Sequence, residues 1–118
     1  MQVTAYASQA RTATPTAADL AAYRARAAVV VIDVTAVTST PSVTFTVSGI
    51  DAASGKVWTL LASAAIATTG TTVLKIGPGL TAAANAAAND VIPDNIRVAP
   101  VHGNANSITY TVGVHFIR

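Results

Sequence analysis

Apolar and polar side chains alternate strictly near the end of the chain, over residues 108–116. A β-strand points successive side chains to opposite faces, so this period of two predicts a strand with one buried face. We expect this strand to lie in the interior of a sheet. The residues expected on the buried face are Tyr110, Val112 and Val114, and those on the opposite face are Thr109 and Thr111.

The same kind of pattern predicts further strands along the chain. Val43, Phe45 and Val47 alternate with Thr and Ser, and other segments are rich in β-branched residues. The predicted strands span residues 29–37, 43–50, 57–62, 72–76, 96–101 and 107–118. Segments rich in Gly, Pro, Asn, Asp and Ser separate them and predict turns. Pro100 indicates an edge or a bulge, because proline lacks a backbone donor.

Six or seven short strands in 118 residues predict an all-β fold with one core. We expect a single antiparallel β-sandwich of six to eight strands, immunoglobulin-like or jelly-roll-like, over residues 27–118. The Ala-rich segment predicts one short helix near 81–89, with Thr81 as its N-cap and Asn89 as its C-cap.

Residues 1–26 show no sustained period and are expected to form an extended N-terminal arm outside this domain. Thr16 and Asp19 have the spacing of a capping box, which leaves a short helix and ordered coil as alternatives over 16–26. The arm carries few large apolar side chains that could anchor it to a neighbouring subunit. These candidate partner-binding residues are Val3, Tyr6, Leu20 and Tyr23.

Charged residues make up only 10% of the chain while hydrophobic residues make up 52%, and Glu is absent. Such a neutral surface suits a protein that packs against copies of itself or a partner, and an uncharged monomer is the alternative. The net charge is +2, and the basic residues are scattered, so we expect no direct nucleic-acid binding. The apolar run from Ala27 to Ile32 is too short to cross a bilayer, so no membrane partner is expected.

Metal and cofactor motifs are missing from the sequence. There is no Cys, and His102 and His115 stand in a predicted turn and on the polar face of the last strand. The segment Gly77-Pro78-Gly79 lacks the spacing of a phosphate-binding loop. We therefore expect no metal, no cofactor and no metal-binding or cofactor-binding residue.

Two other residues leave a structural and a functional interpretation open. Asp33 lies in an apolar run and is either an acid with a raised pKa or an outward-facing residue, which could pair with Arg97 or Lys56. Trp58 is either a core aromatic or an anchor for a ligand or partner. No nucleophile elbow and no pair of close carboxylates is predicted, so we expect no catalytic residue and no enzyme activity.

Several segments of the chain resemble a family of small structural proteins of siphovirus-type tailed bacteriophages. The segments that carry the resemblance are residues 28–37, 49–56, 61–66, 69–74, 77–85, 102–103 and 107–110. The resemblance implies a non-enzymatic structural protein located in the virion. Capsid decoration or minor head protein, head–tail neck protein and tail protein are the positions that it leaves open.

The expected mechanism is cementing: a small sandwich sits across joints between capsid subunits, and its N-terminal arm lies on a neighbour. The expected partners are the major capsid protein or other virion proteins, together with further copies of this chain. We expect a homo-oligomer, with a trimer as the first expectation. A carbohydrate-binding, adhesin-like sandwich is the alternative from another class, and it would need exposed aromatic side chains.

Overall fold

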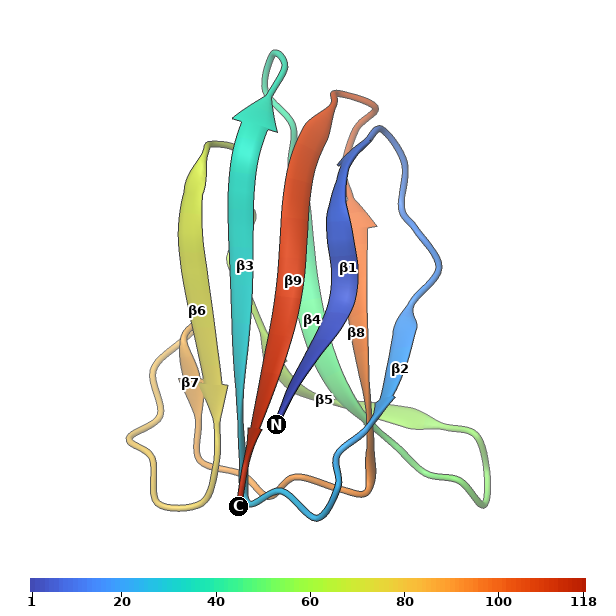
Figure 1. The fold of residues 1–118 in the computed structure, drawn as a ribbon, viewed down its shortest axis with the longest axis vertical. Helices are drawn as coiled ribbons and strands as arrows, with labels where there is room; N and C mark the ends of the chain where they lie inside the picture. The colour runs from blue at the N-terminus through green and yellow to red at the C-terminus, as the bar shows by residue number, and fades with distance from the viewer.

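The computed structural model describes residues 1–118 and contains nine strands and no helix (Figure 1). The strands are β1 (Gln2–Arg11), β2 (Ala18–Ala21), β3 (Ala27–Val37), β4 (Val43–Ile50), β5 (Val57–Ala62), β6 (Gly70–Ile76), β7 (Ala87–Ala88), β8 (Asn95–His102) and β9 (Ile108–Ile117). The all-β class is therefore confirmed, and the predicted strands match β3, β4, β5, β6, β8 and β9 closely.

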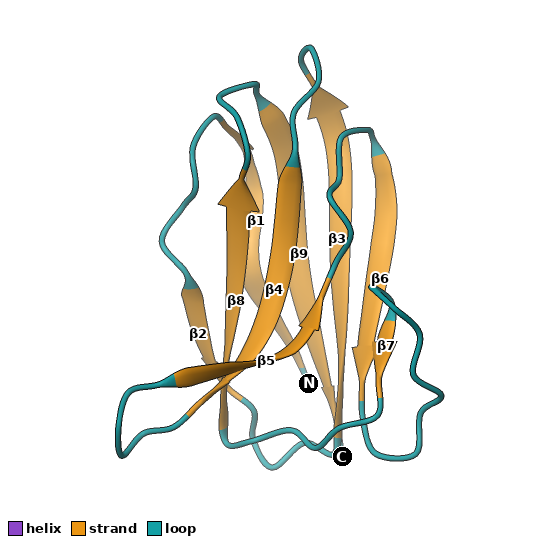
Figure 2. Cartoon of the chain, turned by 180° about the vertical axis from the view of Figure 1, so that it is seen from behind, coloured by secondary structure: helices purple, strands orange, loops and turns teal.

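Two sheets lie face to face, as Figures 1 and 2 show from opposite sides. One sheet has the order β1-β9-β3-β6-β7 and the other has the order β2-β8-β4-β5. All pairs are antiparallel except β6 with β7. The pairs β1–β9, β2–β8, β3–β6 and β4–β5 are nested along the chain, so the chain runs as one long hairpin that is rolled into two layers.

The core lies between the sheets and is built by the alternating side chains. Tyr110, Val112 and Val114 of β9 are fully buried, whereas Thr109 and Thr111 are half-buried on the outer face. β9 pairs with β1 on one side and β3 on the other, so the predicted interior position of this strand is confirmed. Apolar side chains of β3, β4, β6 and β8 supply most of the rest of the same cluster, and Tyr6 of β1 and Leu60 and Leu61 of β5 belong to it as well.

The predicted helix near 81–89 is not seen, and this expectation was wrong. The backbone N–H groups of Ala86 and Ala87 both bond the carbonyl of Ala83, which closes a turn before β7, and Asn85 adopts a φ of 61° within it. An Ala-rich helix here would have no large apolar side chain to bury, and isolated short helices are marginal in water. The backbone instead bonds to β6, because Lys75 N–H donates to the carbonyl of Ala86.

The expected N-terminal arm is also corrected, because residues 1–26 contribute two strands to the sheets. β1 pairs with β9 from Gln2 to Arg11, and β2 pairs with β8. The helix considered over 16–26 is absent; Tyr23 and Arg24 instead have φ values of 52° and 57° in a turn. The sandwich that was expected to begin at residue 27 therefore includes the N-terminal segment.

Candidate functional site

The β4–β5 hairpin projects sideways near the lower end of the sheets, past β2 (Figures 1 and 2). Its loop is held by Asp51, whose carboxylate accepts bonds from Ser54 Oγ at 2.7 Å and from the Ala53 N–H at 3.2 Å. The Ser54 hydroxyl, together with the backbone N–H groups, lowers the pKa of Asp51. Gly55 takes a φ of 73°, which suits glycine. These hydrogen bonds therefore give the hairpin loop a defined conformation.

Trp58, the single tryptophan, lies on this hairpin with 46% of its surface exposed. It pairs with Gly49 across the hairpin, and a Cβ at Gly49 would lie only 2.4 Å from the indole ring. The ring therefore lies flat on the backbone of β4, where only glycine leaves room. The core interpretation of Trp58 is wrong, because the side chain is outside the buried cluster.

A β-bulge explains why Trp58 is outside the core. Val47 pairs with Leu61 and Ser48 with Thr59, so Leu60 is the extra residue, and both leucines are buried. Bulges bend a strand and increase its local twist, and β5 bends away from the sheet beyond this point (Figure 2). The exposed Val57 precedes Trp58 in the strand, so its side chain points to the opposite face of the hairpin. Exposed Trp side chains of this kind are frequent anchors of protein interfaces.

A cluster of rings and one guanidinium lies at the other end of the molecule, between β1, β8 and β9. His102 Nε2 is 3.1 Å from the Tyr110 hydroxyl, and the Arg11 guanidinium lies 4.5 Å from the centre of the Tyr110 ring. The carbonyl oxygens of Thr16 and Val98 lie 2.6 and 3.2 Å from the Tyr6 hydroxyl and share its single proton. The prediction that placed His102 in a turn missed this contact, because it depends on the pairing of strands.

Burial controls the ionisation of this cluster. It raises the pKa of Tyr110 to about 12 and raises the pKa of Tyr6 as well. Burial, and secondarily the nearby Arg11 charge, lowers the pKa of His102 from its usual 6.5. Tyr110 has no exposed surface, so no reactant can reach its hydroxyl. The cluster therefore has a structural role at this end of the sheets.

We expect the protein to lose stability as the pH falls through 6.5 and below. The folded-state pKa of His102 is depressed, so the unfolded chain binds the proton first and protonation favours unfolding. The stability contribution is present above the unfolded-state pKa and is lost progressively as the pH falls toward the folded-state pKa. Melting temperatures between pH 8 and 5 measure this effect, with His102→Gln as the comparison. An equal pH dependence in His102→Gln and wild type would contradict the assignment to His102.

The four candidate anchors of the expected arm have different environments. Tyr6 is buried, and Val3 and Leu20 pack against the core from their strands. Only Tyr23 is largely exposed, with its ring edge-on to that of Phe116 at 6.4 Å. The structure does not bring these residues together on one free surface. Three of them therefore stabilise the fold of their own chain.

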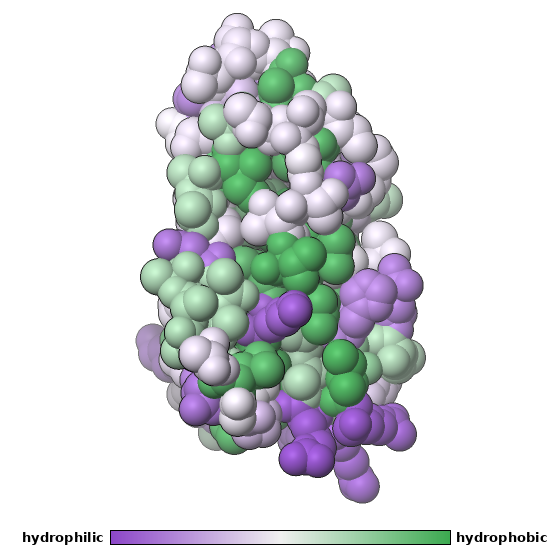
Figure 3. All heavy atoms as spheres, turned by 90° about the vertical axis from the view of Figure 1, so that its left-hand side faces the viewer, coloured by the Kyte–Doolittle hydropathy of each residue, from purple (hydrophilic) through white to green (hydrophobic).

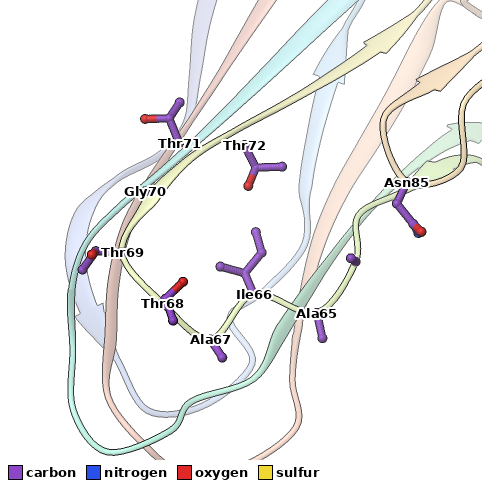
Figure 4. Close-up of a pocket in the computed structure, with 10 residues that line it drawn as sticks. Ala65, Ile66, Ala67, Thr68, Thr69, Gly70, Thr71, Thr72 and Asn85 are labelled. Carbon is purple, nitrogen blue, oxygen red and sulfur yellow. The ribbon is translucent and has the colours of Figure 1, made fainter.

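A hollow of about 320 Å³ lies beside β6 on the side of the molecule seen in Figure 3. Ala and Thr residues of 64–72 line it together with Ile66 and Asn85, and Ile66 and Thr72 face one another across it (Figure 4). No lining residue is charged. The hollow therefore offers hydroxyl and methyl groups but no acid, base or nucleophile with a positioned partner.

The remaining polar residues have simple partners. Asp33 is half-buried on the outer face of β3 and accepts a bond from Thr71 Oγ1 at 3.1 Å. The considered pairing of Asp33 with Arg97 is wrong, because Arg97 binds Asp19 at 2.7 Å and the contact lowers the pKa of Asp19. No three His, Cys, Asp or Glu side chains gather as a metal site, and the chain forms no helix that could span a membrane.

The site that best suits an interaction is therefore the β4–β5 hairpin with Trp58 and Val57. Comparisons of the chain with known protein families, with curated proteins and with solved structures each found no match.

Proposed function

We propose that this protein is a non-enzymatic structural component of a bacteriophage virion, acting as a capsid decoration or minor head protein that cements neighbouring capsid subunits. The observation that carries the proposal is the projecting hairpin, whose exposed Trp58 and Val57 offer apolar side chains to neighbours on its two faces. The proposed partners are the major capsid protein or other virion proteins. The resemblance of several segments between residues 28 and 110 to siphovirus structural proteins supports the same class.

The strand order supports a jelly-roll arrangement over an immunoglobulin-like one. In immunoglobulin-like sandwiches the last two strands are neighbours in one sheet, whereas β8 and β9 belong to different sheets here. With the two-residue β7 set aside, the nested pairs are those of an eight-stranded jelly roll. Jelly rolls occur in viral capsid domains and in lectins, so the topology is compatible with the virion proposal and with the carbohydrate-binding alternative.

The hairpin replaces the N-terminal arm in the proposed cementing mechanism. Residues 2–11 are held in the sheet by β9 and cannot reach a neighbour without breaking the fold. The hairpin loop already lies beyond the sheets, and both of its strands are anchored in the core through Val47 and Leu61. An anchored hairpin with an exposed Trp loses little conformational entropy on binding, which favours affinity.

The test is binding of the purified protein to phage heads that lack it, taken from the phage that encodes it. Trp58→Ala is expected to weaken binding by about 30-fold, because interface anchors contribute about 2 kcal/mol or more. Gly49→Val is expected to weaken it as well, because the new side chain displaces the indole. Val101→Ala, an exposed change on β8, is the matched control and is expected to bind as wild type.

Undiminished binding by folded Trp58→Ala would contradict the role of the hairpin. Binding of the wild type to tails or necks, and not to heads, would favour the tail or head–tail neck alternative. The exposed Trp58 is also the observation that favours the carbohydrate-binding alternative, since sugars stack on exposed aromatic rings. Trp58-dependent binding to an array of glycans, with none to virion proteins, would support that alternative and contradict the virion proposal.

A further inference from the structure

The outer edge of β6 has unpaired backbone groups over residues 70–74. Lys75 and Gly77 donate their N–H groups to Ala86 and Ala88 on the outer side of the strand. In an antiparallel pair, alternate residues point their N–H and C=O groups to the same side. Thr71 and Val73 therefore point theirs to the outer side as well, beyond the end of β7, where no strand accompanies them.

The β1 edge, in contrast, is protected against pairing with another chain. β1 carries two bulges, and Arg11 donates to the carbonyls of Ala7 and Gln9 at 2.9 and 3.1 Å. Bulges and charged side chains are the usual devices that protect sheet edges. This edge is therefore a poor template for a further strand.

The edges of the other sheet are protected too. β2 has only four residues. Beyond β2, the edge of β8 has Pro100, which lacks an N–H, and His102, whose N–H bonds Thr14 Oγ1 at 2.9 Å. β5 is bulged at Leu60, and the carbonyl of Ala62 accepts a bond from the Asn85 amide. The free part of β6 has no bulge, no proline and no charge from Gly70 to Leu74.

We propose that the β6 edge pairs with the β6 edge of a second copy of this chain, antiparallel and about a two-fold axis at Thr72. In this register Thr71 lies opposite Val73 of the other copy, and the reverse, so that outward N–H and C=O groups meet at both positions. The outer side of Lys75 is already paired with Ala87 of β7, so the paired segment ends at Val73 and the second chain turns away at its Gly70, which has a φ of 140°. The two edge strands join the β1-β9-β3-β6-β7 sheets of the two copies into one continuous sheet.

The side chains beside this edge favour a second copy as the occupant. Val73 is 39% exposed on the outer face of β6, and segment 66–74 contains no charged residue that would repel a copy of itself. Figure 3 looks onto this side of the molecule and shows apolar residues gathered along its middle. The short paired segment is below the size of a permanent interface, so we expect a dimer that dissociates on dilution.

Sedimentation velocity over a concentration series tests the pairing. The wild type is expected to pass from one chain to two as the concentration rises. Val73→Pro removes an outward N–H without removing a bond to β3, and Val73→Lys adds a charge at the edge; both are expected to raise the dimer dissociation constant at least tenfold. Val101→Lys, an equally apolar-to-charged change on the exposed face of β8, is the control and is expected to dimerise as wild type.

Hydrogen exchange gives a second measurement that does not depend on a variant. The amides of Thr71 and Val73 are expected to exchange slowly in the dimer and quickly after dilution. A single chain at all concentrations, a trimer, or unchanged dimerisation in the folded Val73 variants would overturn the inference. The pairing does not depend on the proposed attachment to heads, and Trp58→Ala is expected to leave it unchanged.

Discussion

Val112→Asp is expected to abolish folding. Val112 has no exposed surface and lies on the central strand β9, where it pairs with Tyr6 on one side and Ile32 on the other. An unpaired carboxylate there has no cation within the core to offset its lost hydration, and burying such a group costs several kcal/mol. Small domains are stable by only about 5–15 kcal/mol. Circular dichroism on heating is expected to show no cooperative transition in this variant.

Thr109→Asp is the control on the same strand. Thr109 lies on the outer face and pairs with Ala10 and Ala36, so its new carboxylate reaches water. We expect a cooperative transition with a melting temperature near that of the wild type. A folded Val112→Asp protein that melts at the wild-type temperature would contradict the assignment of this face to the core.

Removal of residues 1–11 is expected to unfold the protein, in contrast to the expectation for a free arm. The deletion removes β1, exposes the edge of β9, and takes Tyr6 out of the core. Loss of a buried aromatic side chain alone costs about 3–5 kcal/mol. The truncated chain is expected to lack the far-ultraviolet spectrum of the sheets and to be cleaved rapidly by proteases.

Tyr6→Phe separates the contribution of the hydroxyl from that of the strand. It keeps the ring against Tyr110 and removes only the bonds to Thr16 and Val98. The expected loss is about 1–3 kcal/mol, because the one hydroxyl proton that these carbonyls share is lost. For the deletion, cooperative melting of the protein that lacks residues 1–11, as in the wild type, would restore the interpretation of residues 1–26 as a separate arm.

The strands of the core could be predicted from the sequence because their alternation is unbroken. Over 43–47 and 108–116 every second side chain is apolar, and this is the period that one buried face requires. Strand β1 could not be found in this way. Its two bulges shift the pairing, so that the inward-facing Val3 and Tyr6 stand three residues apart. A bulged edge strand therefore leaves no period of two in the sequence.

The candidate site depends on pairing between distant segments of the chain, and no local sequence pattern reveals which segments pair. From the sequence, Trp58 was either a core aromatic, which is the commoner role, or an exposed anchor, and the bulge at Leu60 together with Gly49 places it on the surface. His102 meets Tyr110 only because β8 and β9 lie in facing sheets.

The sequence by itself thus determined the all-β class and most strand boundaries, since these depend on local side-chain alternation. The tertiary structure decided the strand order, the place of residues 1–26 and the fate of residues 81–89. Helix propensity over 81–89 was overridden because β6 offered backbone partners there, whereas an Ala helix offered no large apolar face to bury. The tertiary structure likewise decides which sheet edges keep unpaired backbone groups, because this depends on how far each strand extends beside its neighbour.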